Sequence, residues 1–242
     1  MEDLYGWHWQ DFAELGSTND CAVKLSEQPP SPRFVITAAR QTAGRGRRGR
    51  SWQSLEGNLF MSLGMEMEQR RWSELVFVIS LALLETVHLF KPRIDVSLKW
   101  PNDVLVAGGK ISGILLEKGA GMYIIIGIGV NIASAPAVSE SLLYHSASLA
   151  EAGIKTDRIT FLKAFLQQFN RGLERWNRQG FAEVKDLWLR SAKGVGSEIR
   201  VNLPRESLSG IFKGLGDDGC LLLEIAGEIK KIAAGDVFFQ QD

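Results

Sequence analysis

The sequence predicts an α+β fold followed by a small all-β module. Between residues 34 and 132, strand-like runs follow one another with few helical stretches, which favours a mixed or antiparallel sheet. After residue 194 the chain changes to short β runs separated by turns. Its 242 residues, 45% of them hydrophobic, can bury one large core or two unequal ones. We expect a first domain over residues 1–193 and a second over residues 194–242.

Composition narrows the class of protein. The 28 Lys+Arg balance the 28 Asp+Glu, so no broad basic face for a nucleic acid is predicted. No apolar run reaches about 18 residues and no signal peptide begins the chain, so neither a membrane span nor secretion is expected. Cys21 and Cys220 stand far apart, which suits a reducing, cytoplasmic location. No Cys/His cluster has zinc spacing, so no metal held by a protein cage is expected.

The first half of the chain alternates turns and apolar runs. Ser17 or Thr18 is a candidate N-cap for a helix that contains the helically spaced run Cys21, Ala22 and Leu25. The expected strands are residues 34–39, 58–66 and 96–100, and a helix capped by Ser73 should cover residues 74–90.

The second half predicts a hairpin, a long strand and two helical runs. The hairpin joins residues 104–106 to 110–117, and the strand covers residues 122–132. Thr156 should start the next helix, and a second helical run should cover residues 181–191. The first of these runs carries an apolar stripe at spacings of three and four that predicts core packing: Leu162, Leu166, Phe169, Leu173 and Trp176.

Residues Gln41–Trp52 form the most distinctive stretch, with three glycines interleaved among four arginines. Glycine lets a backbone approach a ligand closely, and arginine offers a charged fork of donors for phosphate or carboxylate. Gly44-Arg-Gly-Arg-Arg-Gly49 also fits a dinucleotide fingerprint, but no amphipathic helix follows it. A nucleic-acid patch or a solvated loop remains an alternative. A pocket for a small anion is favoured.

Three further motifs contain residues that could bind a ligand or take part in catalysis. Lys99-Trp-Pro-Asn-Asp103 places an amide and a carboxylate on a turn, although such turns usually only reverse the chain. Lys110 lies between glycines in a strand pattern, where a plain surface lysine is the common explanation. In Gly127-Ile-Gly-Val-Asn131 the two glycines and the asparagine share one strand face, which predicts a bare strip for a flat ligand or a crowded helix crossing.

Together these parts suit phosphoryl or nucleotidyl transfer, where catalysis depends on positioning and charge stabilisation. Cationic side chains would clamp phosphates, and carboxylates would help to hold a Mg²⁺ that keeps most of its waters.

The combination of Ser17-Thr-Asn19, Gln41 with Gly44–Trp52, Lys99–Asp103, Lys110-Ile-Ser-Gly113 and Gly127–Asn131 resembles the biotin–protein ligase family. The resemblance runs from about residue 10 to the C-terminus. It implies a class II synthetase-like catalytic domain with a small C-terminal SH3-like β-barrel. It also implies a two-step reaction in which biotin and ATP give biotinyl-5′-AMP, and a lysine of a biotin carboxyl carrier protein then takes the biotin.

The resemblance also implies roles by motif position. The implied catalytic residues are Lys110, Arg45, Arg47 and Asp103, of which Asp103 would orient the acceptor lysine or take its proton. The implied biotin-binding residues are Ser17, Thr18, Asn19, Gln41, Arg45, Gly46, Arg47, Lys110, Gly113, Gly127 and Gly129. The implied ATP- and adenine-binding residues are Arg47, Arg48, Trp52, Asn102, Lys110 and Asn131.

Family members that repress transcription carry a helix-turn-helix domain ahead of the Ser-Thr-Asn motif, and about sixteen residues precede it here. We therefore expect no operator binding. The sequence leaves open whether the chain is a monomer or a homodimer. The alternatives are a lipoate or octanoate transferase on a similar scaffold and, in another class, a nucleic-acid-binding module that uses Arg45–Arg50.

Overall fold

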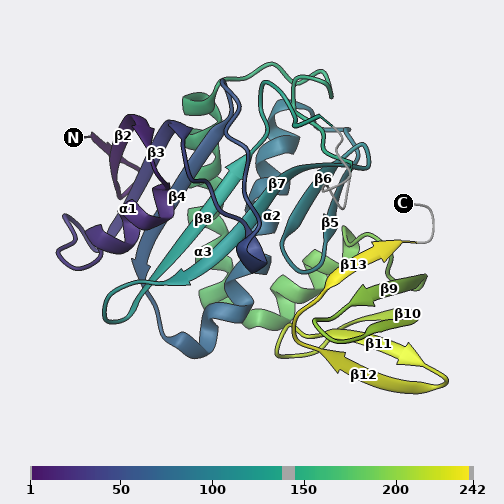
Figure 1. Cartoon of the computed structure of the whole chain (residues 1–242). Coiled ribbons are helices and arrows are strands. Elements are labelled where there is room, and N and C mark those ends of the chain that lie inside the picture. The colour runs from purple at the N-terminus through teal and green to yellow at the C-terminus, as the bar shows by residue number, and fades with distance from the viewer. Residues whose placement is uncertain (1, 138–144, 240–242) are drawn as a thin grey trace.

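A computed structural model describes residues 2–137 and 145–239, so the ends of the two predicted domains, Met1 and residues 240–242, lie outside the described residues. Within them, a large sheet with helices is followed by a smaller antiparallel sheet (Figure 1). The predicted α+β class with a C-terminal β module is therefore confirmed.

The large sheet is mixed, as predicted. Its described strands lie in the order β1-β2-β3-β4-β8-β7-β6-β5, and β2 and β3 are its parallel neighbours whereas the other adjacent strands pair antiparallel. The strands are β1 (Glu2–Leu4), β2 (Trp7–Leu15), β3 (Arg33–Gln41), β4 (Leu59–Glu66), β5 (Val96–Lys99), β6 (Asp103–Val106), β7 (Gly109–Lys118) and β8 (Tyr123–Val130).

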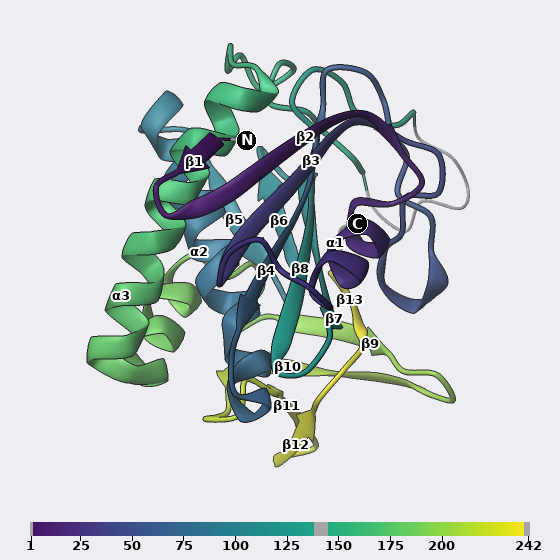
Figure 2. The same cartoon turned by 90° about the vertical axis from the view of Figure 1, so that its left-hand side faces the viewer.

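The helices cover the two faces of this sheet unequally. Two long helices, α2 (Trp72–Phe90) and α3 (Arg158–Arg190), pack on one face, and the short α1 (Thr18–Leu25) lies on the other (Figure 2). The predicted apolar stripe of α3 is buried, which confirms its place in the core. Gly180, with φ 78° and ψ −179°, interrupts the helical geometry of α3 just before the second predicted helical run.

Two predicted helix starts are wrong. The second helix begins at Trp72, before Ser73, because the indole N–H of Trp72 donates to the carbonyl of Met67 at 3.2 Å and anchors the first turn. The last helix begins after Asp157 rather than at Thr156. Asp157 Oδ1 accepts from the backbone N–H groups of Ile159 and Thr160 at 2.8 and 3.0 Å, which a threonine hydroxyl one residue earlier does not do.

The stretch Gln69–Phe90, which contains α2, is long and apolar enough to cross a membrane by length and composition, because an 18-residue window of it has a mean hydropathy of 1.7. Polar and charged residues interrupt the apolar run, so no membrane span was predicted from the sequence. In this fold 61% of that window is buried, as expected for a core helix between a sheet and α3.

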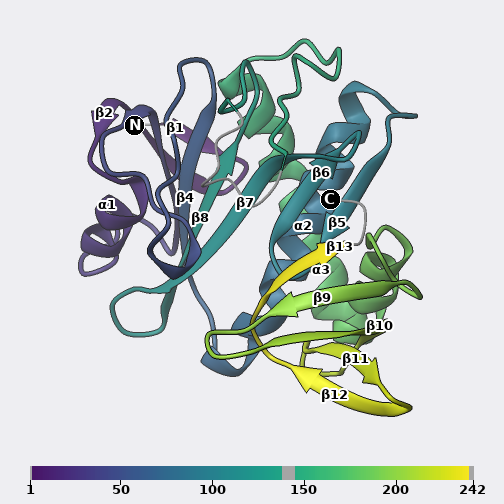
Figure 3. The same ribbon diagram turned by 45° about the vertical axis from the view of Figure 1, so that its right-hand side comes forward.

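The C-terminal sheet is antiparallel and lies beside the β5 edge of the large sheet (Figure 3). Its strand order is β12-β11-β10-β9-β13. The strands are β9 (Glu198–Asn202), β10 (Ser207–Leu215), β11 (Leu221–Ile225), β12 (Glu228–Ile232) and β13 (Asp236–Phe239). Backbone hydrogen bonds between Leu98 of β5 and both Ser191 and Lys193 fix the point where the chain enters this sheet.

A half-buried ion pair ties β2 to the first turn of α3. The two Nη atoms of Arg158 donate to the two carboxylate oxygens of Asp11 at 2.7 and 2.6 Å, and Thr37 Oγ1 donates to Asp11 Oδ1 at 2.7 Å. Partial burial acts to raise the pKa of Asp11, but the hydrogen bonds from Arg158 and Thr37 and the Arg158 charge outweigh it and hold this pKa below its usual value.

This depressed pKa sets a pH dependence of stability. The ionised carboxylate stabilises the fold above its unfolded-state pKa of about 3.9, and the contribution is lost as the pH falls through the lower folded-state pKa. We expect Asp11→Asn to lower the free energy of unfolding by about 1 kcal/mol at neutral pH. Urea unfolding should show the deficit vanish in strong acid. A deficit of equal size in strong acid would contradict this account of Asp11.

Candidate active site

One pocket gathers nearly all of the residues that the sequence predicts to be functional. It has a volume of about 370 Å³, within the range of small-molecule sites, and lies on the α1 side of the large sheet. The start of α1, the loop after β3, the β5–β6 turn, β7, β8 and β13 all contribute to it. The predicted residues that line it are Ser17, Thr18, Asn19, Gln41, Arg45, Gly46, Arg47, Trp52, Asn102, Asp103, Lys110, Gly113, Gly127, Gly129 and Asn131. Arg48 is the predicted residue that does not.

The start of α1 forms a buried polar network. Ser17 caps the helix, as one of the two predicted candidates. The backbone N–H and the hydroxyl of Thr18 donate to Gln41 Oε1 at 2.8 and 3.0 Å. Ser62 of β4 donates to Asn19 Oδ1 and lies 2.8 Å from Thr18 Oγ1. These side chains are thus held in place by one another before any ligand arrives.

Two carboxylates hold Arg45 at this end of the pocket. Arg45 Nη2 contacts Asp20 Oδ1 at 2.6 Å and Glu117 Oε2 at 3.0 Å. Glu117 Oε2 also accepts from Asn19 Nδ2 at 2.6 Å. Glu117 therefore joins the cationic loop to the polar network at the start of α1.

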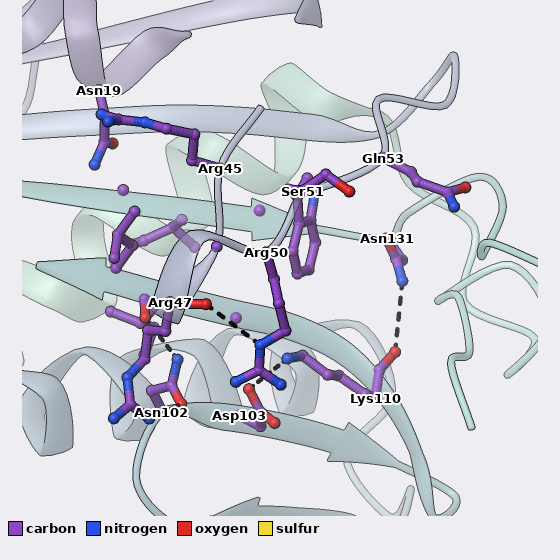
Figure 4. A pocket seen from close by; sticks show the side chains of 18 of the residues that line it. Asn19, Arg45, Arg47, Arg50, Ser51, Gln53, Asn102, Asp103, Lys110 and Asn131 are labelled. Carbon is purple, nitrogen blue, oxygen red and sulfur yellow. Dashed lines mark hydrogen bonds and ion pairs between the residues drawn. The ribbon is translucent and has the colours of Figure 1, made fainter. Parts of the chain in front are cut away.

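The tip of the loop is folded against the β5–β6 turn. Arg47 Nη1 donates to Asn102 Oδ1 at 3.1 Å, and Arg50 Nε donates to the carbonyl of Arg47 at 3.3 Å (Figure 4). Burial lowers the pKa of Arg47, while the carboxylates of Asp236 and Asp103 act in the opposite direction. Arginine remains charged at any physiological pH, so Arg47 brings a fixed positive charge to the pocket wall.

Lys110 and Asp103 form an ion pair inside the pocket, with Nζ and Oδ1 2.6 Å apart (Figure 4). Lys110 Nζ also lies 5.7 Å from the centre of the Trp52 ring. The pairing of β6 with β7 shifts register between Val104 and Leu105, so that β7 uses two residues where β6 uses one. This bulge turns Lys110 to the same side as Gly113, which strict alternation would not do.

The glycine face of β7 and β8 is covered by side chains. An added Cβ at Gly129 would overlap the Trp52 indole, one at Gly113 would crowd the same indole, and one at Gly127 would overlap the Asn19 carboxamide. The expected bare strip is therefore occupied, because the loop lays its tryptophan on it. Trp52 Nε1 is buried without a hydrogen-bond partner among the described residues. Such an orphaned donor costs roughly 1–3 kcal/mol, which a ligand acceptor would offset.

The two asparagines predicted to bind ATP or adenine, Asn102 and Asn131, are held differently. Asn131 Nδ2 donates to the carbonyl of Ala147 at 3.1 Å, which turns its own carbonyl oxygen away from that backbone. Asn102 is engaged at both ends, since its Nδ2 donates to the carbonyl of Ile114 at 2.7 Å and its Oδ1 accepts from Arg47. The contacts of Asn102 thus position Arg47.

No role in binding biotin or ATP was predicted for several groups at the site, among them Ser62, Glu117, Arg50 and Asp236. Arg50 belongs to the arginine–glycine loop. Glu117 lies on β7 four residues after Gly113 and two after Leu115, both of which line the pocket. Strand alternation could have found Glu117. Asp236 is 186 residues from Arg50 in the chain, and nothing in the sequence connects the two.

A ligand-sized pocket with clamping arginines and a buried lysine–carboxylate pair defines the site of an enzyme rather than of a structural module. The chain belongs to the Biotin/lipoate A/B protein ligase family, which residues 12–131 match, and residues 194–240 match the Biotin protein ligase C terminal domain. This confirms the family predicted from the five motifs.

Curated relatives and solved structures agree with this membership. The chain is 36% identical to the biotin–[acetyl-CoA-carboxylase] ligase of Paracoccus denitrificans, over 94% of this chain and 99% of that protein. It is 33% identical to the enzyme of the same name from Mycobacterium tuberculosis, over 96% of this chain and 89% of that protein. The structure of the biotin protein ligase from Aquifex aeolicus in complex with biotin and ATP matches with a TM-score of 0.82 and 30% identity, covering 96% of this chain and 97% of that chain.

Proposed function

We propose that this protein activates biotin with ATP to biotinyl-5′-AMP and transfers the biotin to a lysine of a biotin carboxyl carrier protein. The observation that carries the proposal is the single pocket that joins a buried polar network, an arginine loop and the Lys110–Asp103 pair. Relatives that match over nearly their full length bear the name of this activity.

The polar end of the pocket suits the ureido ring of biotin. Ser17, Thr18 and Asn19 are each at most 4% exposed, and Gln41 is fixed by its bonds to Thr18. A ring urea carries one acceptor and two donors, and leaving any of them unpaired in such a place would cost roughly 1–3 kcal/mol. We assign these four residues to the biotin ring and tail, with Gly127 leaving the room that Asn19 needs.

The cationic side of the pocket suits the carboxylate of biotin and the phosphates of ATP. In the first step a carboxylate oxygen of biotin attacks the α-phosphorus of ATP, a carboxyl–phosphate anhydride forms and pyrophosphate leaves. Negative charge grows on the phosphoryl oxygens, and the fixed charges of Arg45, Arg47 and Lys110 would stabilise it without reorganisation. Gly46 allows the loop backbone to close over the acid.

The adenine would lie near Trp52 and Asn131. The Asn131 carbonyl oxygen is the kind of acceptor that the adenine amino group requires, and the indole offers a flat apolar face. Gly113 and Gly129 let that indole lie directly on the sheet, where a Cβ would meet it. Asn102 acts here through Arg47, while the direct contacts of Asn102 and Arg48 with nucleotide remain predictions.

In the second step the ε-amine of the acceptor lysine attacks the acyl carbon, AMP leaves and the nitrogen loses a proton. Asp103 is 7% exposed and paired with Lys110, so it can orient the acceptor amine or receive its proton. We propose that the acceptor approaches along this pair.

Mg²⁺ fits the site as a companion of ATP. Among the described residues, no group of three or more His, Cys, Asp or Glu side chains could hold a metal ion. The pocket carboxylates Asp103 and Asp236 both have cationic partners. When bound to the phosphates with most of its waters, Mg²⁺ would screen their charge and need no protein cage.

Transfer of biotin is the direct test. Incubation with ATP, Mg²⁺, biotin and a carrier domain should give a product that streptavidin detects, and a carrier with its acceptor lysine changed to arginine should give none. Absence of product from the intact carrier would refute the proposal. The same incubation with lipoate or octanoate in place of biotin tests the alternative function. Preferred transfer of either one would assign the chain to the other branch of its family.

Other expectations remain proposals. The division of the chain at residues 193/194 is supported by the family match that begins at residue 194. We also propose a cytoplasmic location, no binding to DNA or to membranes, and a possible homodimer. The nucleic-acid alternative requires steeply salt-dependent DNA or RNA binding through Arg45–Arg50, and its absence at moderate ionic strength would dismiss that alternative.

A further inference from the structure

One carboxylate of the C-terminal sheet reaches into the site. Asp236, the first residue of β13, contacts two arginines of the loop: Oδ2 lies 2.8 Å from Arg48 Nη1 and Oδ1 lies 2.7 Å from Arg50 Nη2. The Asp236 side chain is only 14% exposed, against 33% and 39% for the two arginines. Asp236 is therefore the least exposed member of this three-residue cluster.

A chain of contacts leads from Asp236 to the pocket wall. Arg50 Nε donates to the carbonyl of Arg47, and the backbone N–H of Gly46 donates to the carbonyl of Arg50 at 2.6 Å. Arg47 in turn donates to Asn102 on the β5–β6 turn. The position of Arg50 thus determines where the backbone of Arg47 lies.

The loop needs a counter-charge to hold this shape. Arg48 has φ 57° and ψ 33°, a left-handed conformation that costs a non-glycine residue about 1 kcal/mol or more. The neighbouring guanidinium groups also repel one another. The two contacts with Asp236 offset both costs, since one carboxylate binds the arginines on either side of Gly49.

The C-terminal sheet is also attached to the turn that faces the loop. The indole N–H of Trp100 donates to the carbonyl of Gly219 at 3.2 Å, and Lys99 Nζ lies 5.0 Å from the centre of the Phe239 ring. Trp100 is 3% exposed, so this contact is internal. Asp236 therefore stands on a support that is fixed to the β5–β6 turn.

From these contacts we infer that Asp236 is a positioning residue, which holds Arg48 and Arg50 so that Arg47 and Arg50 face the phosphates of the nucleotide. The identity of the ligand rests on the proposed function. The contacts of Asp236 with Arg48 and Arg50, which we call the latch, do not rest on it. Arg48 does not line the pocket, so its pairing with Asp236 acts through the conformation of the loop.

Limited proteolysis tests the latch without any activity. Trypsin cleaves after arginine, and Arg45–Arg50 offers four such sites. Asp236→Asn should speed cleavage within this loop at least about fivefold, because a local opening becomes more populated. The matched control is Asp217→Asn, which removes the 2.6 Å contact of the same sheet with Lys185 of α3. The control should leave loop cleavage unchanged.

Kinetics supply the second readout. Asp236→Asn should raise the KM for ATP about five- to tenfold and change the KM for biotin little, and Asp236→Glu should recover part of the loss. Arg48→Ala should have a similar or smaller effect, because Arg50 keeps its own contact with Asp236. The double variant should be no worse than Asp236→Asn alone, because that single change already removes the contact with Arg48. Additive effects would mean that Arg48 contacts the nucleotide directly, which would contradict its role in the latch.

The outcomes separate the two proposals. If the wild-type chain forms no adenylate, the proposed function fails and loop cleavage alone decides the latch. Unchanged cleavage in Asp236→Asn, or cleavage spread evenly over the whole chain, would overturn the inference about Asp236.

Discussion

Replacement of Lys110 by alanine is expected to slow adenylate formation by about 10²- to 10³-fold, the loss typical of one charge-stabilising donor at a reacting centre. Lys110 Nζ lies 2.6 Å from Asp103 in a pocket that also contains Arg45 and Arg47. Its side chain is only 22% exposed, so the charge acts in a poorly solvated place where it counts for more than in water. Single-turnover release of pyrophosphate with saturating biotin and ATP measures this step.

The removal of Lys110 also leaves Asp103 without its partner, and the resulting instability has to be separated from lost catalysis. Asp103→Asn in the Lys110→Ala background removes the stranded charge and should restore the unfolding temperature without restoring the rate. Lys118→Ala, at the far exposed end of β7, serves as the matched control and should keep the full rate. A near-normal rate in Lys110→Ala would exclude the residue from the mechanism.

Replacement of Gly127 by alanine is expected to weaken biotin binding by about 10- to 100-fold. The new methyl group would overlap the carboxamide of Asn19, which is bonded to Ser62 and Glu117 and cannot turn aside without breaking these contacts. The loss of one or two such buried hydrogen bonds corresponds to this change in Kd. Isothermal titration calorimetry with biotin measures the Kd of the variant directly.

Gly16→Ala is the matched control for that substitution. A Cβ at Gly16 meets nothing within 4 Å and its φ is not positive, although it immediately precedes the polar network. Its biotin affinity should equal that of the wild type. If Gly127→Ala also binds biotin normally, Asn19 does not need its present position and our assignment of the biotin ring fails.

The sequence predicted the parts of the site that obey local rules. Alternation along β8 puts Gly127, Gly129 and Asn131 on one face, and a hydroxyl residue caps α1. The arginine–glycine loop follows a strand, as its composition suggested. These features depend on neighbours in the chain, so pattern and spacing were sufficient to find them.

Other features depend on contacts that no local pattern encodes. The bulge in β7 that turns Lys110 into the pocket is specified by its pairing with β6. Trp52 covers the glycine strip because the loop folds back over the sheet, so the strip was wrongly expected to be bare. Asp236 meets Arg50 only after the C-terminal sheet has packed beside β5. The two helix starts that were predicted wrongly depend instead on local contacts, of the Trp72 indole with Met67 and of Asp157 with two backbone N–H groups.

In the proposed reaction, the pocket joins biotin to AMP before any acceptor is present. The purified protein should be mixed with biotin, Mg²⁺ and ATP labelled in the α-phosphate, without a carrier domain, and its bound nucleotide identified by mass spectrometry. We expect close to one protein-bound biotinyl-5′-AMP per chain, and pyrophosphate in solution. If no adenylate forms and calorimetry detects binding of neither biotin nor its adenylate, the account is contradicted.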